Sequence, residues 1–288
     1  MKRSDFRFFH RLRVRWAEVD MQNIVFNAHY LMYFDTAVTD YWRVLGMPYQ
    51  ESMHHLGGDT YVKKATIEFN ASARMDERID VAMKCARIGN SSMVFEGAIF
   101  RDNDLLITCE LVYVFADPAT QKSKPVPAAL RELLLAYEAG EDVLDVRVGP
   151  WSELREPARR IRTEVFVEEQ RVPLEMEWDE ADDTALHAVA FNRIGQAVAT
   201  GRLLPAKEGT AKIGRVAVHK VLRGSGVGRR VMDALMQAAL RRGDRRIVLH
   251  AQRSAESFYL GLGFRPHGQE FEEAGIPHIE MVRELAPA

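Results

Sequence analysis

The sequence predicts two α+β domains that meet near residue 141. First, the chain has 288 residues, which exceeds the usual length of one domain. Second, a polar, proline-rich stretch, ADPATQKSKPVP (116–127), separates two regions of different pattern. Third, one long helical pattern precedes several strand-like runs in the first region, whereas strands and helices alternate in the second. We therefore assign residues 1–140 and 141–288 to separate domains.

Composition narrows the class of protein. Hydrophobic residues make up 47% of the chain and charged residues 28%, which is typical of a packed globular protein. The net charge of −2 lacks the basic excess of a nucleic-acid-binding protein. Cys85 and Cys109 have no Cys or His at ligand spacing, so neither a disulfide nor a metal site is expected. Without a membrane-spanning run or secretory signal, we expect a cytoplasmic protein with no membrane partner.

The first region begins with an alternating run over 8–16, which predicts a strand. Apolar residues at helical spacing predict a helix over 28–45, and Gly46 and Pro48 are expected to end it. Four further strands are predicted over 61–69, 78–88, 92–101 and 105–115. This order indicates an antiparallel sheet with one helix on one face. A short amphipathic helix, 128–139, ends at Gly140.

The second region alternates strands with helices. We expect a helix over 152–169 with Ser152 as its N-cap, and a tight turn at Gly195. Further helices are expected over 229–242 and 254–262. Strands are expected over 144–148, 187–193, 196–205, 212–219, 246–250 and 278–282.

A glycine-rich segment, RGSGVG (223–228), lies between a predicted strand and a predicted helix. Glycine allows left-handed turns and close approach of a ligand, and the helix directs free N–H groups and its positive end at the loop. An anionic phosphate is therefore the expected ligand. The segment lacks the G-K-[ST] ending of a P-loop and the spacing of a Rossmann fingerprint. It fits R-x-x-G-x-G through Arg223, Gly226 and Gly228.

Together with FYLGLGF (258–264), EVFVEEQRVP (164–173) and EEAGIPHIEM (272–281), this loop resembles the GNAT acyltransferases of the ElaA type over residues 144–284. The resemblance implies a mixed α/β fold and acetyl-CoA-dependent acyl transfer to an amine that the sequence does not identify. It also implies that loop amides bind the CoA diphosphate and that a strand edge binds the pantetheine arm. The implied CoA-binding residues are Val216, Ala217, Val218, Arg223, Gly224, Ser225, Gly226, Val227 and Gly228.

The same resemblance implies that Tyr259 protonates the leaving thiolate. The alternative role of Tyr259 is an aromatic core residue of an apolar helix. No general base is identified. An acidic run is compatible with attraction of an amine or with a solvated face. It consists of Glu168, Glu169, Glu175, Glu177 and Asp179.

In the first region, Asp20 lies in VDMQNIVFNAHY (19–30), just before the long predicted helix. A carboxylate at this place either caps the helix or acts on a substrate. Asn23 suits a left-handed bend, because asparagine tolerates that conformation better than most residues.

This segment resembles the 4-hydroxybenzoyl-CoA thioesterase (YbgC-like) branch of hotdog-fold proteins, and the resemblance extends over residues 8–138. It rests on Asp20, Asn23, Ile24, Val25, Phe26, Asn27 and Tyr30, and on KSKPVP (122–127). It implies acyl-CoA hydrolysis, with Asp20 as nucleophile or general base and the Asn27 N–H as oxyanion donor. Asn23 replaces the usual Gly, Asn27 a frequent His, and His29 a common Asn. The Asn27 N–H is retained, because every residue except proline supplies one.

The combined prediction is a bifunctional enzyme with thioesterase and N-acyltransferase domains. Acyl-CoA and acetyl-CoA are the expected substrates, with no permanently bound cofactor and no metal. Hotdog proteins pair through a sheet edge, so we expect a homodimer or homotetramer. Two alternatives stay open. One is an active acyltransferase whose hotdog domain is a dimerisation scaffold or an acyl-CoA sensor, and the other is a CoA-binding regulator without turnover.

Overall fold

The structure, a computed structural model, describes residues 1–285. The chain forms two compact units, Met1–Val143 and Leu144–Ala288. Each unit combines one sheet with helices, so the predicted α+β class with two domains is confirmed. None of the helices that the structure describes is both long and apolar enough to cross a membrane.

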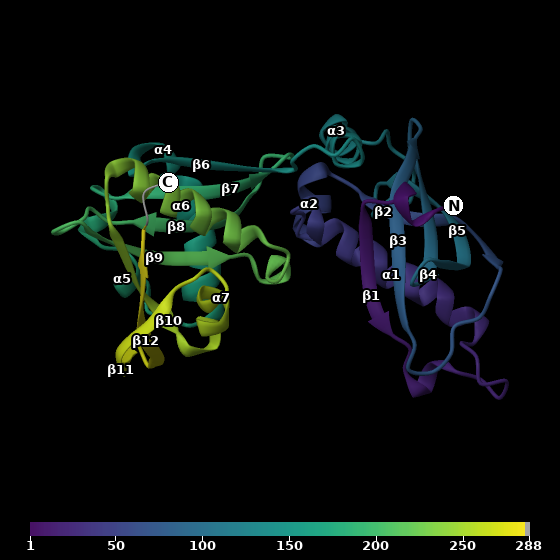
Figure 1. The fold of residues 1–288 in the computed structure, drawn as a ribbon. Coiled ribbons are helices and arrows are strands. Elements are labelled where there is room, and N and C mark those ends of the chain that lie inside the picture. Colours follow the sequence, from purple (N-terminus) through teal and green to yellow (C-terminus); the bar gives the residue numbers. More distant parts are fainter. Residues whose placement is uncertain (286–288) are drawn as a thin grey trace. The chain divides into compact units, whose positions relative to one another are not determined.

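The first unit is a five-stranded antiparallel sheet with one long helix against it (Figure 1). The strand order is β1-β3-β4-β5-β2, so β1 and β2 form the two edges. Its elements are β1 (Phe8–Arg13), α1 (Asn27–Val44), α2 (Tyr49–Leu56), β2 (Asp59–Phe69), β3 (Arg78–Ile88), β4 (Ser92–Arg101), β5 (Asp104–Ala116) and α3 (Ala128–Glu138). Apolar side chains of α1 at helical spacing are fully covered, which explains why this sequence forms the central helix.

Most of the predicted elements of this unit are present, with two differences. The first strand ends at Arg13 rather than at Trp16, because the Glu18 carboxylate accepts the Arg15 N–H and closes a short 3-10 turn. The helix α2 was not predicted, since YQESMHHL has little apolar periodicity of its own. The predicted end of α1 is confirmed, because Gly46 has φ 70° directly after the helix.

Gly97 allows α1 to lie close to the sheet. A Cβ atom at this position of β4 would lie 2.6 Å from Cε1 of Phe34 and 2.8 Å from Sδ of Met83. Phe34 and Met83 are both fully buried, so neither side chain has free space to move into. The absence of a side chain at Gly97 therefore sets the distance between the helix and the sheet.

The second unit is a mixed sheet of seven strands in the order β11-β12-β10-β9-β8-β7-β6. Only β9 and β10 run parallel, and the other neighbours are antiparallel. The strands are β6 (Leu144–Pro150), β7 (Leu186–Asn192), β8 (Ala197–Leu203), β9 (Thr210–Val218), β10 (Arg246–Gln252), β11 (Arg265–Glu273) and β12 (Ile276–Glu284). The helices are α4 (Trp151–Arg162), α5 (Leu174–Glu177), α6 (Val227–Arg242) and α7 (Glu256–Leu260).

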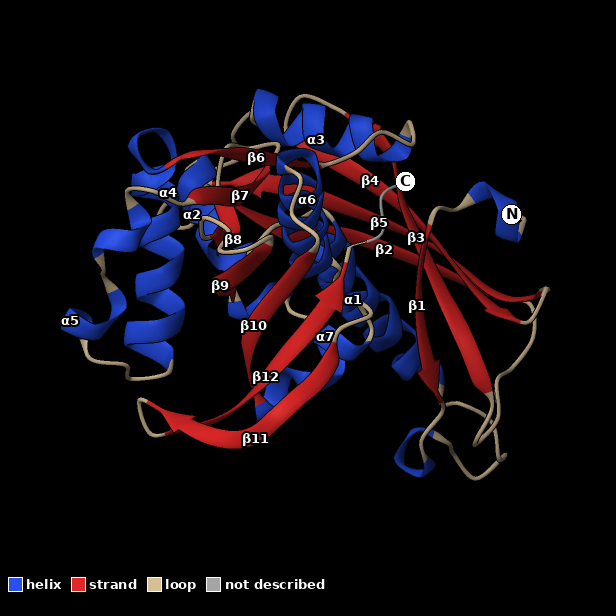
Figure 2. Cartoon of the chain, turned by 60° about the vertical axis from the view of Figure 1, so that its left-hand side comes forward, coloured by secondary structure: helices blue, strands red, loops and turns tan. Residues whose placement is uncertain are grey.

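The helices α4 and α6 cover opposite faces of this sheet (Figure 2). Ala188 and Ala190 of β7 pack with the α6 core, whereas Val189 between them packs with α4. Since side chains alternate along a strand, these neighbours must point to opposite faces. The sheet is therefore a buried layer between two helices. This explains why its strands carry apolar residues on both faces.

Two predictions for this unit are wrong. Ser152 is not an N-cap, because α4 begins at Trp151 after Pro150, and no side chain caps it. The helix predicted over 152–169 is α-helical only to Arg162 and continues as a π-helix, Thr163–Glu169. The strand β11 was not predicted, since RPHGQEFEE is polar and mostly exposed at the sheet edge.

We expect Gly97→Ala to lower the free energy of unfolding by about 1–3 kcal/mol, because the added methyl group overpacks the contact with Phe34. Chemical denaturation followed by far-UV circular dichroism would measure this change. Gly214→Ala is the matched control, because its Cβ would meet no atom within 4 Å. Equal stability of the two variants would contradict the role given to Gly97.

Candidate functional sites

Asp20 lies on a tight loop between the 3-10 turn and α1. Its N–H donates to the Ile24 carbonyl at 3.0 Å, and its own carbonyl accepts the Asn23 N–H at 3.0 Å. Asn23 has φ 59°, which confirms the predicted left-handed residue. Oδ1 of Asp20 accepts the Gln22 N–H at 2.8 Å, and Oδ2 has no hydrogen-bond partner within residues 1–285. The half-buried carboxylate is thus oriented by its own loop and keeps one oxygen available.

The helix α1 begins with backbone donors that no side chain caps. Its N-cap residue is Phe26, in extended conformation, so Asp20 does not cap this helix. The N–H groups of Asn27 and Ala28 are too early in the helix to have an intrahelical acceptor. Neither donates to any other group in the part of the chain that the structure describes. The positive end of the helix dipole adds to these two donors.

A buried carboxylate, Glu18, holds both ends of this loop. It accepts hydrogen bonds from the Arg15 N–H at 2.7 Å and from the Tyr33 hydroxyl at 2.7 Å, and its carbonyl accepts the Phe26 N–H at 2.9 Å. Burial alone would raise the pKa of Glu18, but the hydrogen bonds from Arg15 and Tyr33 outweigh it and hold that pKa below its ordinary value. Glu18 therefore ties the Asp20 loop to α1 through an ionised group.

His29 contacts Phe26, the residue that precedes α1. Its ring packs edge-on against the ring of Phe26, with centroids 6.0 Å apart, and its N–H donates to the Phe26 carbonyl. No contact joins it to Asp20 within the described residues.

In the second unit, a cavity of about 1220 Å³ brings together most of the predicted CoA-binding positions. Its lining includes Val216, Ala217, Val218, Arg223, Gly224, Gly226, Gly228 and Tyr259. Two predicted residues do not line it. The Ser225 hydroxyl donates to the Leu222 carbonyl at 2.6 Å, and the Val227 side chain is buried in the core beneath α6.

The glycine loop presents free backbone donors to this cavity. Gly224 and Gly226 have φ 84° and 91°, so residues with a side chain would be strained at both positions. Gly226 is also the N-cap residue of α6, and no side chain caps the helix. The N–H groups of Gly226, Val227 and Gly228 therefore have no partner among residues 1–285. Such a cluster of amides at a helix start is suited to an anion.

Gly228 is needed for another reason. A Cβ atom there would lie 3.1 Å from Cγ2 of Val218 and 3.4 Å from Cζ of Phe258. The first turn of α6 thus lies directly against β9 and α7.

The strands β9 and β10 separate beside the loop. They pair only through 210–212 and 246–248, so 213–218 has no ladder partner on the β10 side within the described residues. On its other side, β9 stays paired with β8 up to Val218. An extended ligand could therefore add hydrogen bonds to the open edge of β9.

The structure is compatible with both roles that the sequence left open for Tyr259. Its ring packs against Phe258 and Phe264, and only 8% of the residue is exposed, yet it lines the cavity. Burial raises the pKa of its hydroxyl to about 12, so this group keeps its proton at neutral pH. The geometry therefore permits a proton donor that is also a core residue.

Three residues of the acidic run, Glu169, Glu177 and Asp179, form ion pairs with arginines. Glu169 accepts two hydrogen bonds from the Arg223 guanidinium, at 2.7 and 2.6 Å, so this side chain is already engaged. The hydrogen bond from Arg223, which outweighs burial, lowers the pKa of Glu169. The Arg223 side chain is consequently occupied. The groups of the glycine loop that are free to bind a ligand are its backbone amides.

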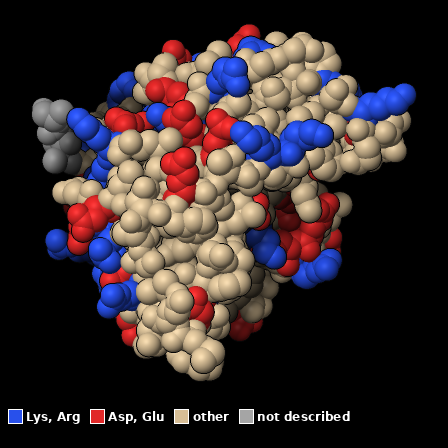
Figure 3. All heavy atoms as spheres, turned by 90° about the vertical axis from the view of Figure 1, so that its right-hand side faces the viewer, with Lys and Arg blue, Asp and Glu red and all other residues tan. Residues whose placement is uncertain are grey.

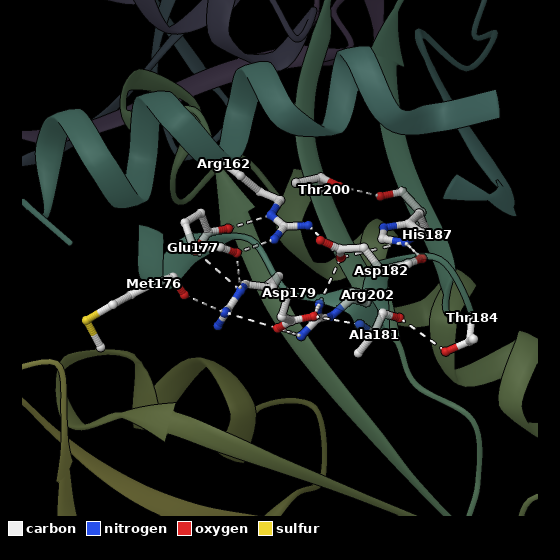
Figure 4. Close-up of polar contacts among 12 residues, drawn as sticks. Arg162, Met176, Glu177, Asp179, Ala181, Asp182, Thr184, His187, Thr200 and Arg202 are labelled. Carbon is white, nitrogen blue, oxygen red and sulfur yellow. Dashed lines mark hydrogen bonds and ion pairs between the residues drawn. The ribbon is translucent and has the colours of Figure 1, made fainter. Parts of the chain in front are cut away.

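A buried ion network supports the wall of the cavity (Figure 4). Arg162 binds Glu177 at 2.5 Å and Asp182 at 2.8 Å, and Arg202 binds Asp182 at 2.8 Å and Asp179 at 2.6 Å. Arg162 is 1% exposed, so its charge must be paired. The network fixes 177–182, and sequence reasoning missed Arg162, Asp182 and Arg202 because their partners come from separate elements.

Comparison with known proteins finds a family for each unit. The family described as "Acetyltransferase (GNAT) domain" matches residues 152–285, and the family described as "Thioesterase-like superfamily" matches residues 14–134.

Similar proteins cover the second unit. An uncharacterized N-acetyltransferase of Bacillus subtilis, YjcF, is 40% identical over 125 residues, which are 43% of this chain and 88% of YjcF. Protein ElaA of Escherichia coli is 33% identical over 133 residues, or 45% of this chain and 86% of ElaA. The crystal structure of an acyl-CoA N-acyltransferase from Pseudomonas aeruginosa is 35% identical, with a TM-score of 0.45 and coverage of 49% of this chain and 99% of that one.

The predicted fusion is therefore confirmed. The chain belongs to the GNAT acetyltransferase family through its second unit and carries a thioesterase-like hotdog domain in its first.

Proposed function

We propose that this chain is a bifunctional CoA-thioester enzyme. The first unit hydrolyses an acyl-CoA thioester, and the second transfers an acetyl group from acetyl-CoA to an amine. One observation, shared by both sites, carries the proposal. In each site, helix N–H groups without a side-chain cap lie at the position proposed for the CoA ester. Both thioesters are substrates, and neither half needs a permanently bound cofactor.

For hydrolysis, the thioester carbonyl accepts a hydrogen bond from the Asn27 N–H. The developing negative charge on its oxygen is stabilised by that donor and by the α1 dipole. Asp20 then acts in one of two ways. It attacks the carbonyl carbon, the C–S bond breaks as the CoA thiolate leaves, and water opens the resulting anhydride. Alternatively, it removes a proton from a water that attacks the carbonyl carbon, and the same C–S bond breaks. The free Oδ2 atom is available for either step.

Asp20→Asn is expected to lower kcat/KM for acyl-CoA hydrolysis by at least about 100-fold, because the amide is neither a nucleophile nor a base. Free thiol release from short, long and aromatic acyl-CoA esters measures the rate. Asp102→Asn is the matched control, since it removes the same charge in an exposed turn. Full activity of Asp20→Asn would contradict its role. An inert wild type would favour the alternative of a hotdog scaffold or sensor.

For acyl transfer, the amides of the glycine loop bind the CoA diphosphate, and the open edge of β9 at 216–218 pairs with the pantetheine arm. The amine nitrogen attacks the acetyl carbonyl, the C–N bond forms and the C–S bond breaks. Tyr259 donates its proton to the leaving sulfur. Its raised pKa keeps the phenol protonated before the step.

Gly226→Asp is expected to weaken acetyl-CoA binding at least about tenfold, which corresponds to about 1.4 kcal/mol. The new carboxylate would repel the diphosphate, and the side chain would be strained at φ 91°. Isothermal titration calorimetry with acetyl-CoA gives the dissociation constant. Gly243→Asp is the control, because Gly243 has φ 90° at the other end of α6. Equal affinity of the two variants would exclude this loop as the diphosphate site.

We also propose that the first unit forms a homodimer, or a homotetramer built from it. The edge strand β2 is partly or fully exposed along its whole length, and Val62 on it is 53% exposed. Trp16 and Met21 are even more exposed, at 80% and 101%. In the view of Figure 3, uncharged residues, polar and apolar alike, cover more of the surface than charged residues do. An open edge strand with an exposed apolar residue, and exposed apolar residues elsewhere on the unit, favour pairing with a second copy.

Light scattering is expected to give at least twice the mass of one chain for the wild type. Val62→Asp is expected to shift this equilibrium toward the monomer, since pairing would bury an unpaired charge at the β2 edge. Leu135→Asp, which places the same group at an exposed position of α3, is expected to leave the mass unchanged. A monomeric wild type would contradict the assembly.

A further inference from the structure

Among the carboxylate, lysine and histidine side chains that line the cavity of the second unit, four take no part in the steps above or in the ion pairs already described. They are Lys212, His250, Glu273 and His278. The strands β10 and β12 place Gln252 opposite His278 and His250 opposite Glu280. Because opposite residues of an antiparallel pair share a face, both histidines project to the same side of the sheet. The sequence motif EEAGIPHIEM supplies two members of this group, Glu273 and His278.

The ring of His278 has a defined orientation. Its Nδ1 atom lies 2.7 Å from the Ile276 carbonyl oxygen, and the ring stacks on Phe271 with centroids 5.9 Å apart at 22°. A carbonyl oxygen only accepts, so Nδ1 must carry the hydrogen. In the neutral ring, Nε2 is then the atom with the free lone pair. Nε2 has no hydrogen-bond partner among the residues that the structure describes, and the residue lines the cavity.

His250 has no ring nitrogen with a free lone pair of this kind. Both of its ring nitrogens lie 3.3 Å from Nζ of Lys212, and its Nδ1 atom also lies 3.3 Å from Glu273. Its lone pair therefore faces an ammonium group. This contrast distinguishes the two histidines by geometry alone.

The charges around His278 favour a cationic acceptor. Glu273 lies on β11, Glu280 on its own strand, Lys212 on β9 and His250 on β10. Burial alone would raise the pKa of Glu273, but the hydrogen bond and charge of His250 outweigh it and lower that pKa. Glu273 is therefore ionised at neutral pH and attracts an ammonium group to this wall of the cavity.

We propose that His278 is the general base of the acyl transfer and that the acceptor is a primary amine that arrives as its ammonium form. This inference rests on the acetyltransferase function proposed above. Nε2 of His278 removes one proton from the ammonium group, and the nitrogen lone pair then attacks the acetyl carbonyl. The C–N bond forms, the nitrogen loses its second proton to solvent, the C–S bond breaks and the sulfur takes the Tyr259 proton. The imidazolium releases its proton to solvent, and the Tyr259 phenolate takes one up.

His278→Asn tests the proposal, because the Asn side-chain NH₂ can still donate to the Ile276 carbonyl while the basic nitrogen is lost. We expect kcat/KM for acetylation of spermidine and of lysine methyl ester to fall at least about 100-fold. The acidic limb of its pH profile is expected to disappear. The dissociation constant for acetyl-CoA is expected to stay unchanged, which separates loss of the base from loss of the CoA site.

The matched control is His267→Asn, which changes an exposed histidine of β11 that does not line the cavity. It is expected to keep the wild-type rate and pH profile. Retention of both in His278→Asn would overturn the assignment. Loss of acetyl-CoA binding in that variant would also overturn it, because His278 would then support the cavity rather than the proton transfer.

A second measurement does not depend on the acceptor. Nitrogen-15 correlation spectra of the full chain report which ring nitrogen of His278 carries the proton. We expect the Nδ1–H tautomer in the neutral ring and a shift of the Nε2 resonance when acetyl-CoA binds. An Nε2–H tautomer would overturn the inference whatever the activity. Failure of the wild type to acetylate either amine, with the expected tautomer present, would instead count against these acceptors and the proposed transferase function.

Discussion

Both sites depend on helices that begin without a side-chain cap. An ordinary N-cap serine or aspartate would satisfy the first N–H groups of α1 and α6 and leave nothing for a ligand. Here Phe26 precedes α1 and Gly226 precedes α6, and neither has a capping side chain. The uncapped donors cost stability in the free protein, and a thioester oxygen or a phosphate can satisfy them. In the proposed function, the same backbone property serves two different reactions of CoA esters.

Such exposed donors need rigid supports, and a buried charged side chain supplies one in each unit. Glu18 fixes the Asp20 loop through Arg15 and Tyr33, and Arg162 fixes the wall of the cavity through Glu177 and Asp182. A buried charge without a partner is strongly destabilising, so each group tolerates few alternative arrangements. These charges therefore hold the Asp20 loop and the cavity wall in position more than they add to the net stability of the fold. The close contact of Phe34 with Gly97 has the same effect on α1 by packing.

Much of the fold was predictable from local patterns. The strands β3 and β4 have the predicted bounds, and the left-handed Asn23 and Gly195 lie at the predicted bends. These features depend on neighbouring residues alone. The helix α2 and the strand β11 were missed, because their polar sequences adopt these forms only against the rest of their unit. Ser152 was mistaken for a cap because Pro150 allows the helix to begin one residue earlier.

For the proposed sites, the sequence by itself indicated the candidates that act through the backbone or belong to one motif: the Asp20 loop, the glycine loop and Tyr259. Glycine content, helix starts and turn residues act over a few positions, so they can be read along the chain. Tertiary structure alone decided that Arg223 is held by Glu169, that β9 and β10 separate, and that His278 enters the cavity. Each depends on distant segments meeting, and no local pattern encodes the distance between them.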